Sequence, residues 1–174
     1  ASAGMDVTLR QTSPWLVRNE AELLGDGRAR LLCYGLAPSE VMPAHSGVDP
    51  GAIRYRLPEA QRGMRLMSIA YLETDGKLAV TEAQSKTYYP ASGEGLAEER
   101  SITVDALRVT GAREIRIYWS AETSYNGFDK QPYSEGRDEG AELRARFRKK
   151  PDSPVVCLAR HIEDYRSFYD RLEF

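Results

Sequence analysis

Apolar and polar side chains alternate along much of this chain, and this is the period-two pattern of half-buried β-strands. Residues 28–36 are apolar on both faces, which is typical of a central strand, whereas residues 77–89 are more polar and predict a strand near an edge. The clearest strands are predicted over residues 6–10, 28–36, 65–74, 77–89, 102–109, 114–121, 142–148 and 155–161.

Turn and loop residues separate the first predicted strands. The tripeptide Gly25-Asp26-Gly27 predicts a reversal of the chain, and a short helix capped by Asn19 is the competing interpretation. The prolines and glycines between residues 37 and 58 predict a long irregular connection that contains a short strand over residues 52–57. These segments favour short strands joined by loops.

Two further connections between predicted strands are short. Asp75-Gly76 is a favoured two-residue turn, so residues 65–74 and 77–89 are predicted to pair as a hairpin. Only residues 110–112 separate the next two strands, and consecutive strands with a short connection are usually neighbours. We therefore expect those two strands to pair in antiparallel orientation.

The C-terminal residues change period. Ile162, Tyr165, Tyr169 and Leu172 recur at helical spacing, which predicts an amphipathic helix packed on a sheet, although a longer final strand could include its first residues. Short strands, few helices and turn-rich loops are typical of antiparallel sandwiches and barrels. The predicted fold is therefore a mainly β antiparallel sandwich with one C-terminal amphipathic helix, and a barrel is the alternative.

Length, composition and charge narrow the class of protein. The chain has 174 residues, of which 41% are hydrophobic and 29% charged, and this predicts one soluble globular domain over residues 5–174. Residues 1–4 precede the first methionine and are interpreted as a cloning remnant or a processed N-terminus. The net charge of −2 gives no electrostatic footprint for nucleic acid, and no apolar run has the length of a membrane span. We therefore expect neither a nucleic-acid partner nor a membrane span.

The chain has two cysteines, Cys33 and Cys157, and both lie in strand-like apolar runs. Buried thiols that behave as small hydrophobic side chains are one interpretation. A single disulfide between an early and a late strand is the other, and it would favour a secreted or periplasmic protein. Reduced thiols would instead favour the cytoplasm.

The common catalytic and ligand-binding signatures are absent from the sequence. It contains no glycine-rich phosphate-binding motif, no nucleophile elbow, no paired-cysteine zinc motif and no calcium-binding loop. We therefore expect no cofactor and no metal. One catalytic alternative stays open, in which Cys33, His161 and Glu163 form the thiol–imidazole–carboxylate arrangement of a small hydrolase or transferase. It requires the last strand to continue through Glu163.

The most suggestive segment for binding is the long loop over residues 124–136. Tyr125, Phe128 and Tyr133 are interspersed there with small polar residues, and the loop closely follows Trp119. Aromatic side chains supply rigid contact area, and Asn, Ser and Gly supply adaptable hydrogen bonds, as in other binding loops. The competing interpretation is that these aromatic side chains fold back over the end of the sandwich.

A basic stripe is the second candidate surface. In a strand over residues 142–148, Arg144 and Arg146 would share the outward face and could meet phosphate or an acidic partner. The alternative is a solvated sheet face that pairs with acidic residues on the neighbouring strand or protects a sheet edge.

These absences and the aromatic loop favour a non-catalytic β-sandwich module that binds another protein or a surface ligand. A small enzyme that uses Cys33 and a small-ligand carrier with a cavity between its sheets are the alternatives. The sequence indicates no particular oligomeric state.

Overall fold

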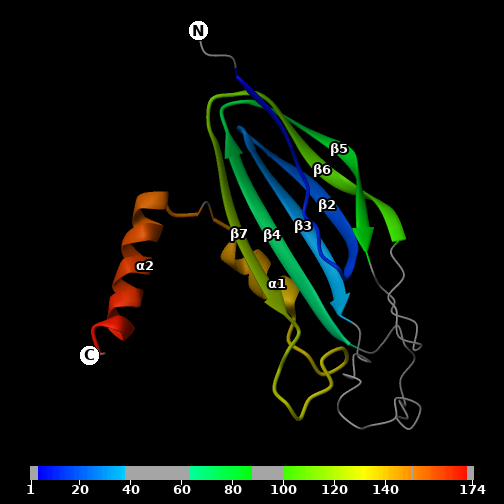
Figure 1. The fold of residues 1–174 in the computed structure, drawn as a ribbon, viewed down its shortest axis with the longest axis vertical. Coiled ribbons are helices and arrows are strands. Elements are labelled where there is room, and N and C mark those ends of the chain that lie inside the picture. The colour runs from blue at the N-terminus through cyan, green and yellow to red at the C-terminus, as the bar shows by residue number, and fades with distance from the viewer. Residues whose placement is uncertain (1–3, 38–62, 88–99, 150, 172–174) are drawn as a thin grey trace.

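A computed structural model describes residues 4–37, 63–87, 100–149 and 151–171, and two antiparallel sheets make up most of this part of the chain (Figure 1). The strands are β1 (Met5–Leu9), β2 (Leu16–Gly25), β3 (Arg28–Ala37), β4 (Met64–Thr74), β5 (Lys77–Thr87), β6 (Arg100–Ala112) and β7 (Ile115–Thr123). The helices α1 (Glu139–Arg146) and α2 (Pro154–Tyr169) follow. One sheet has the strand order β1-β6-β5 and the other has the order β2-β3-β4-β7.

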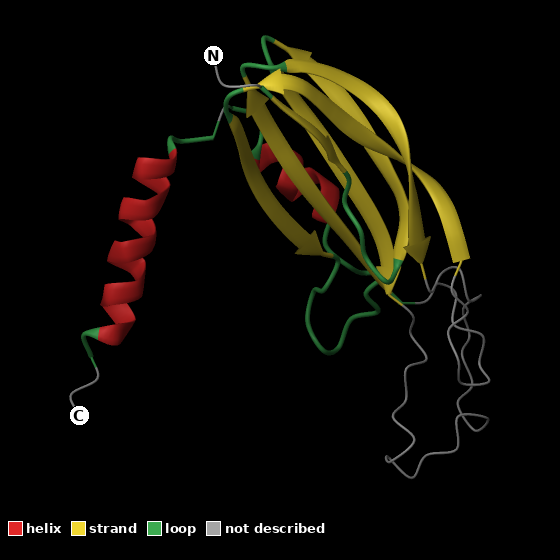
Figure 2. Cartoon of the chain, turned by 45° about the horizontal axis from the view of Figure 1, so that its top comes forward, coloured by secondary structure: helices red, strands yellow, loops and turns green. Residues whose placement is uncertain are grey.

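The predicted mainly β sandwich is confirmed. The two sheets lie face to face and do not close into a barrel, so the barrel alternative is wrong (Figure 2). The C-terminal helix is also confirmed, and the structure adds α1, which the sequence pattern does not predict. The predicted irregular connection and its short strand over residues 52–57 lie outside the described residues, apart from Ala37 at the end of β3.

The first hairpin follows the predicted reversal at Gly25-Asp26-Gly27. β2 and β3 pair across a two-residue turn, in which the φ angles of Asp26 and Gly27 are 50° and 68°. Positive angles at both positions match the right-handed twist of a hairpin, and Asp-Gly is a favoured sequence for them. The alternative helix capped by Asn19 is wrong, because Asn19 lies within β2 and pairs with Cys33.

Asp75 and Gly76 do not form the predicted hairpin. β4 pairs with β3 and β7 whereas β5 pairs with β6, so this turn carries the chain from one sheet to the other. The connection from β6 to β7 also crosses between the sheets, and these strands are not the neighbours that their short separation predicts. In a sandwich, a short connection can join strands of opposite sheets as well as strands of one sheet, and local turn chemistry does not distinguish the two.

The β4–β5 and β6–β7 connections, which are the two crossings between the sheets, lie at the same end of the sandwich and are hydrogen-bonded to each other. The Asp75 carboxylate accepts hydrogen bonds from the backbone N–H groups of Arg113 (2.8 Å) and Glu114 (3.0 Å). The Thr74 hydroxyl donates to the carbonyl oxygen of Glu114 (2.8 Å) and accepts from the N–H of Gly76 (3.0 Å). One turn therefore ties the β4–β5 connection to the β6–β7 connection.

Apolar side chains fill the space between the sheets and also cover the outer face of β4. The inward-facing residues pack in clusters that contain Leu16, Ala29, Leu31, Cys33, Ala70, Leu72, Val104, Leu107, Val109 and Ala112. On the other face of the four-stranded sheet, α1 packs through a cluster that contains Leu32, Met67, Ile69, Tyr71, Leu143 and Phe147. β4 is thus buried on both faces, and this accounts for its nearly continuous apolar sequence.

α1 replaces the strand that is predicted over residues 142–148. Asp138 caps the helix by accepting a hydrogen bond from the N–H of Ala141 (2.8 Å), and acidic residues occupy the first turn. Leu143 and Phe147 are four residues apart, and both are buried against the sheet. The strand prediction is wrong because a spacing of four residues lies on one face of a helix as well as on one face of a strand.

α2 includes the residues for which a last strand over residues 155–161 is predicted. Ser153 caps the helix by accepting a hydrogen bond from the N–H of Val156 (3.4 Å), and Pro154 suits the first helical position because its missing N–H has no partner there in any helix. None of the α2 residues is buried, and Figures 1 and 2 show the helix standing apart from the sheets. The predicted packing of this helix on a sheet is therefore wrong.

Replacement of Asp75 by asparagine tests the bonded crossings. The N–H groups of Glu114 and Arg113 hold the pKa of Asp75 below its ordinary value of 3.8. The ionised carboxylate therefore stabilises the fold above pH 3.8, and this stabilisation is lost as the pH falls through the lower pKa of the folded state.

We expect Asp75→Asn to lower the melting temperature at neutral pH, and we expect the difference from the wild type to shrink as the pH falls below 3.8. Melting curves recorded by circular dichroism between about pH 2 and pH 8 measure this difference. A difference that stays constant over the whole range would contradict the assignment.

Candidate functional site

The loop between β7 and α1 is anchored at its base by Arg65 of β4. The Arg65 guanidinium donates to the Glu139 carboxylate (3.1 Å) and to the carbonyl oxygens of Tyr133 and Arg137. The backbone N–H of Arg65 donates to the hydroxyl of Ser124 (3.0 Å), which is fully buried. Contacts from this single residue therefore hold both ends of the loop.

Hydrogen bonds inside the loop hold its two arms together. The Asn126 amide donates to the carbonyl oxygen of Glu135 (3.0 Å), and the Arg137 guanidinium donates to that of Tyr125 (2.8 Å). Gly136 occupies a position where a Cβ atom would collide with backbone oxygens of the loop, so only glycine fits there. The loop therefore has a defined shape.

The three aromatic residues of the loop have different environments. Phe128 is 97% exposed and Tyr125 is 49% exposed. Tyr133 is partly buried, and the centre of its ring lies 5.5 Å from the guanidinium carbon of Arg65. The structure thus leaves Phe128 and Tyr125 accessible to another molecule, while Tyr133 packs into the base of the loop.

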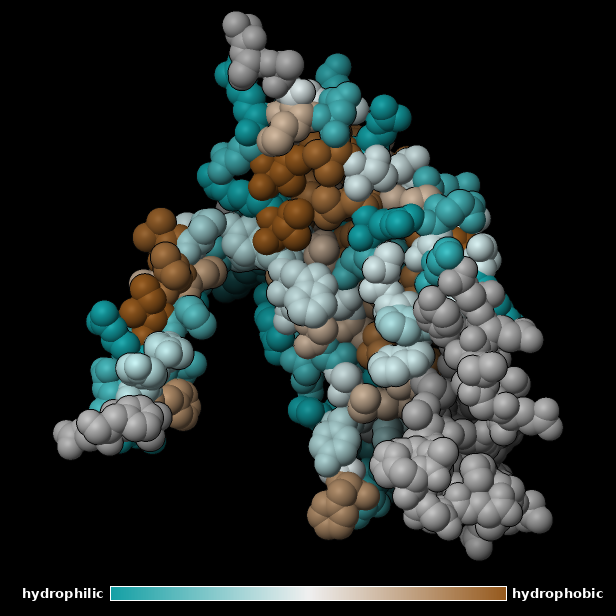
Figure 3. All heavy atoms as spheres, viewed as in Figure 1, coloured by the Kyte–Doolittle hydropathy of each residue, from teal (hydrophilic) through white to brown (hydrophobic). Residues whose placement is uncertain are grey.

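Trp119 lies on β7, on the face that is turned toward the three-stranded sheet. Its register neighbour Ala70 is buried between the sheets, but Trp119 is 63% exposed, since three strands do not cover the inner face of all four. The indole N–H donates to the side-chain oxygen of Gln11 (2.9 Å). Ile117 and Met5 are also about half exposed, and Figure 3 shows hydrophobic surface between β1 and β7.

Arg144 and Arg146 do not form the predicted basic stripe, because they lie in the last turn of α1 rather than on a strand. The Arg146 guanidinium donates to Glu122 and Ser120 of β7, at 2.5 Å each. Arg144 donates to the hydroxyl of Tyr34 (2.8 Å). Both arginines therefore attach α1 to the outer face of the four-stranded sheet, which is the face opposite Trp119.

The structure does not bring Cys33, His161 and Glu163 together. Cys33 is 2% exposed within β3, whereas His161 and Glu163 are exposed on α2, where two residues of separation directs them away from each other. Burial raises the pKa of the Cys33 thiol, which disfavours the reactive thiolate. Both cysteines are free, so the alternative of a disulfide is wrong. Of the two thiols that are predicted to be buried, Cys33 is buried and Cys157 is exposed.

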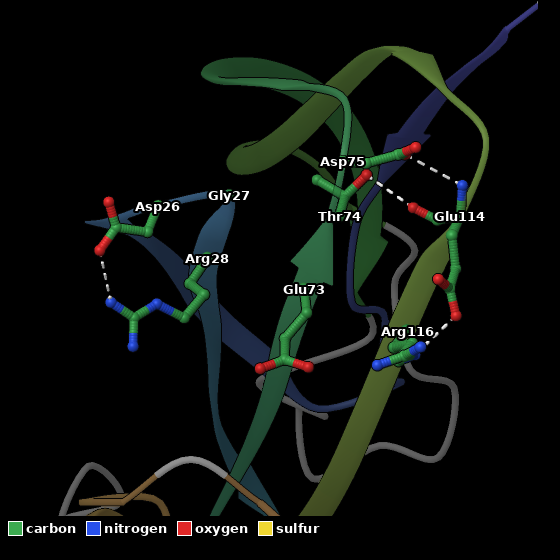
Figure 4. A pocket seen from close by; sticks show the side chains of 8 residues that line it. All are labelled: Asp26, Gly27, Arg28, Glu73, Thr74, Asp75, Glu114 and Arg116. Carbon is green, nitrogen blue, oxygen red and sulfur yellow. Dashed lines mark hydrogen bonds and ion pairs between the residues drawn. The ribbon is translucent and has the colours of Figure 1, made fainter. Parts of the chain in front are cut away.

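A cavity of about 480 Å³ opens beside the two crossings (Figure 4). It is lined by Asp26, Gly27, Arg28, Glu73, Thr74, Asp75, Glu114 and Arg116. Arg28 pairs with Asp26 (3.0 Å) and Arg116 pairs with Glu114 (2.6 Å), so the lining charges bind one another. The sequence gives no signal for this cavity, because its residues come from three segments that are far apart in the chain.

The described part of the chain shows neither a metal site nor a membrane-spanning helix. No three His, Cys, Asp or Glu side chains are grouped there in a way that could hold a metal ion. Neither α1 nor α2 is long and apolar enough to cross a membrane.

No family model, no curated protein and no solved structure matches this chain. The candidate site is therefore defined by its own geometry, which is an ordered loop with Phe128 and Tyr125 on its surface.

The reactivity of the two thiols tests the environment of Cys33. We expect one thiol, Cys157, to react quickly with iodoacetamide in the native protein, and we expect Cys33 to react at least about a hundredfold more slowly until the protein unfolds. Mass spectrometry of alkylated peptides over time measures both rates. A Cys157→Ser variant should have no fast thiol, and rapid native labelling of Cys33 would contradict its burial.

Proposed function

We propose that this protein is a non-catalytic binding module whose loop over residues 124–136 contacts another protein. The proposal rests on the exposure of Phe128. Its side chain is 97% exposed, although hydrogen bonds hold the loop around it in a defined shape. Burial of a large apolar side chain in a partner's pocket removes apolar surface from water and so stabilises the complex. Interface residues that dominate binding energy are often aromatic anchors in such pockets.

The anchored base of the loop supports the same function. Association costs about 0.5–1.5 kcal/mol for each flexible side chain that must be ordered at an interface. Arg65, through its bonds to Glu139 and Ser124, holds the loop in one shape before any partner arrives. Tyr125 adds a half-exposed ring with a hydroxyl group, so the loop combines an apolar anchor with a group that can form hydrogen bonds.

The other two candidate functions receive less support. Cys33 is buried in β3 and lies on a different element from His161 and Glu163, so the arrangement that would activate its thiol is not formed. A small-ligand carrier needs space between its sheets. The inner faces instead pack directly on each other, for example where Leu31 meets Leu107.

A peptide library displayed on phage and selected against the immobilised full chain tests the proposal. We expect enriched peptides to bind the loop, and we expect Phe128→Ser to weaken their binding at least tenfold. The reason is that removal of an interface anchor typically costs about 2 kcal/mol, and about 1.4 kcal/mol corresponds to a tenfold change in affinity. Isothermal titration calorimetry with synthetic peptides measures the affinities.

Val80→Ser is the matched control for this experiment. Val80 is an apolar residue that is 45% exposed on β5, in the other sheet, so its replacement should leave the affinity unchanged. Peptides that bind Phe128→Ser as tightly as the wild type would contradict the proposal, as would a library with no enriched binder.

A further inference from the structure

β7 is an edge strand with an open edge. In the described part of the chain it pairs with β4 on one side and with no strand on the other. The N–H of Ser124 bonds to the carbonyl oxygen of Arg65 on the β4 side (2.9 Å). Because backbone groups alternate along a strand, the N–H and C=O groups of residues 115, 117, 119, 121 and 123 are directed to the open edge. They form a template for a further strand.

The other edge strands carry features that discourage pairing, whereas the charged residues of β7, Arg116 and Glu122, are of opposite sign and both lie on its outer face. β1 has only five residues and an irregular register, and β2 contains two register irregularities. β5 carries Lys77, Glu82 and Lys86. β7 has nine residues in unbroken register with β4, and it contains neither lysine nor proline. Natural sheets protect their edges with such features, so β7 is the edge that is open to a partner.

An apolar patch lies directly beside this open edge. Trp119 is 63% exposed and Ile117 is 49% exposed, and both lie on the side of the sheet that the three-stranded sheet leaves uncovered. Figure 3 shows hydrophobic surface between β1 and β7 on this side. Gln11 holds the Trp119 indole through its N–H (2.9 Å), so the ring has a fixed position. α2 does not cover the patch, because none of its residues is buried.

We propose that β7 pairs with β7 of a second copy of this chain, in antiparallel orientation about a two-fold axis at Trp119. In this register the two Trp119 residues face each other, and Ile117 faces Ala121 of the second copy. Residues 115, 117, 119, 121 and 123 then have their open-edge backbone groups opposite those of the second copy, so the strands can exchange ladder hydrogen bonds. The resulting contact is self-complementary, as a two-fold interface requires.

Charge on the outer face favours this register. It places Arg116 opposite Glu122 of the second copy, twice by symmetry, and opposite charges facing each other across strands are stabilising. Within its own chain Glu122 binds Arg146 at 2.5 Å and Arg116 binds Glu114 at 2.6 Å, so the new contact would join two existing ion pairs. An axis at Tyr118 would instead bring Glu122 opposite Glu114, which has the same charge.

Sedimentation velocity of the full chain, at concentrations from about 1 to 200 μM, tests the pairing. One added strand pair is a small interface, so we expect a dissociation constant on the order of 10 μM. Ile117→Lys places a charge in the apolar patch beside the edge and should raise this constant at least tenfold. Val80→Lys is the matched control, since Val80 has a similar exposure (45%) on β5, and it should dimerise like the wild type.

Disulfide trapping in a Cys157→Ser background tests the register without relying on Ile117→Lys. Residues that face each other in a hydrogen-bonded pair have Cα atoms about 5.5 Å apart, which a disulfide can bridge. We therefore expect Trp119→Cys to form a covalent dimer on oxidation. In the same register the two copies of residue 121 are offset by four residues, about 14 Å, so Ala121→Cys should not cross-link.

Several outcomes would overturn the proposal. A wild-type chain that stays monomeric at all concentrations would do so, and this is the result expected if a different protein covers the patch. An unchanged dissociation constant for the Ile117→Lys dimer would mean that the interface lies elsewhere. Cross-linking of Ala121→Cys without cross-linking of Trp119→Cys would exclude the proposed register.

Discussion

Hydrogen bonds between the Asp75 carboxylate and the backbone of the β6–β7 connection join the two places where the chain passes between the sheets. β4 and β5 are consecutive in the chain but belong to different sheets, and the same holds for β6 and β7. Backbone N–H groups in such connections have no partner in a β-ladder, so their hydrogen bonds must come from side chains or water. Asp75 supplies that partner for Arg113 and Glu114, and the Thr74 hydroxyl binds the carbonyl oxygen of Glu114. The sheets are thereby held over each other at the end where the chain passes twice between them.

The two sheets differ in size, and this leaves part of the larger sheet uncovered. The three-stranded sheet covers β2, β3 and part of β4, and it leaves Trp119 and Ile117 of β7 exposed on their inner face. The outer face of β4 would be exposed as well, but Leu143 and Phe147 cover it, and Arg146 attaches their helix to β7. α1 therefore completes one face of the larger sheet. The opposite face of β7 and its open edge have no such cover within the described part of the chain.

The sequence pattern predicts the sandwich and most of its strands because the local period of apolar residues is set by burial on one or two faces. It predicts the turn at Asp26-Gly27 for the same local reason. It fails for residues 142–148, where a spacing of four residues is compatible with both strand and helix. The helix-start signals at Asp138 and at Ser153-Pro154 are present in the sequence and would have corrected the prediction. The binding loop is predicted from its composition, but its anchor is not. Arg65 and Glu139 are 74 residues apart, and nothing local indicates that they meet.

The loop follows directly on the strand that carries the open edge, and this links the two proposals. The loop begins at Ser124, directly after β7 ends at Thr123. In an antiparallel pair of β7 strands about Trp119, the two loops leave from opposite ends of the joined sheet, roughly 34 Å apart along the strand direction. A dimer would therefore present two Phe128 side chains to separate positions on a repeating or dimeric partner. Engagement of both loops raises the apparent affinity without a new contact, provided that the spacing of the partner's sites matches the spacing of the two loops. A weak dimer with a small binding loop on each copy fits this two-site binding. Once the first loop is bound, the effective concentration of the second loop at its site is raised.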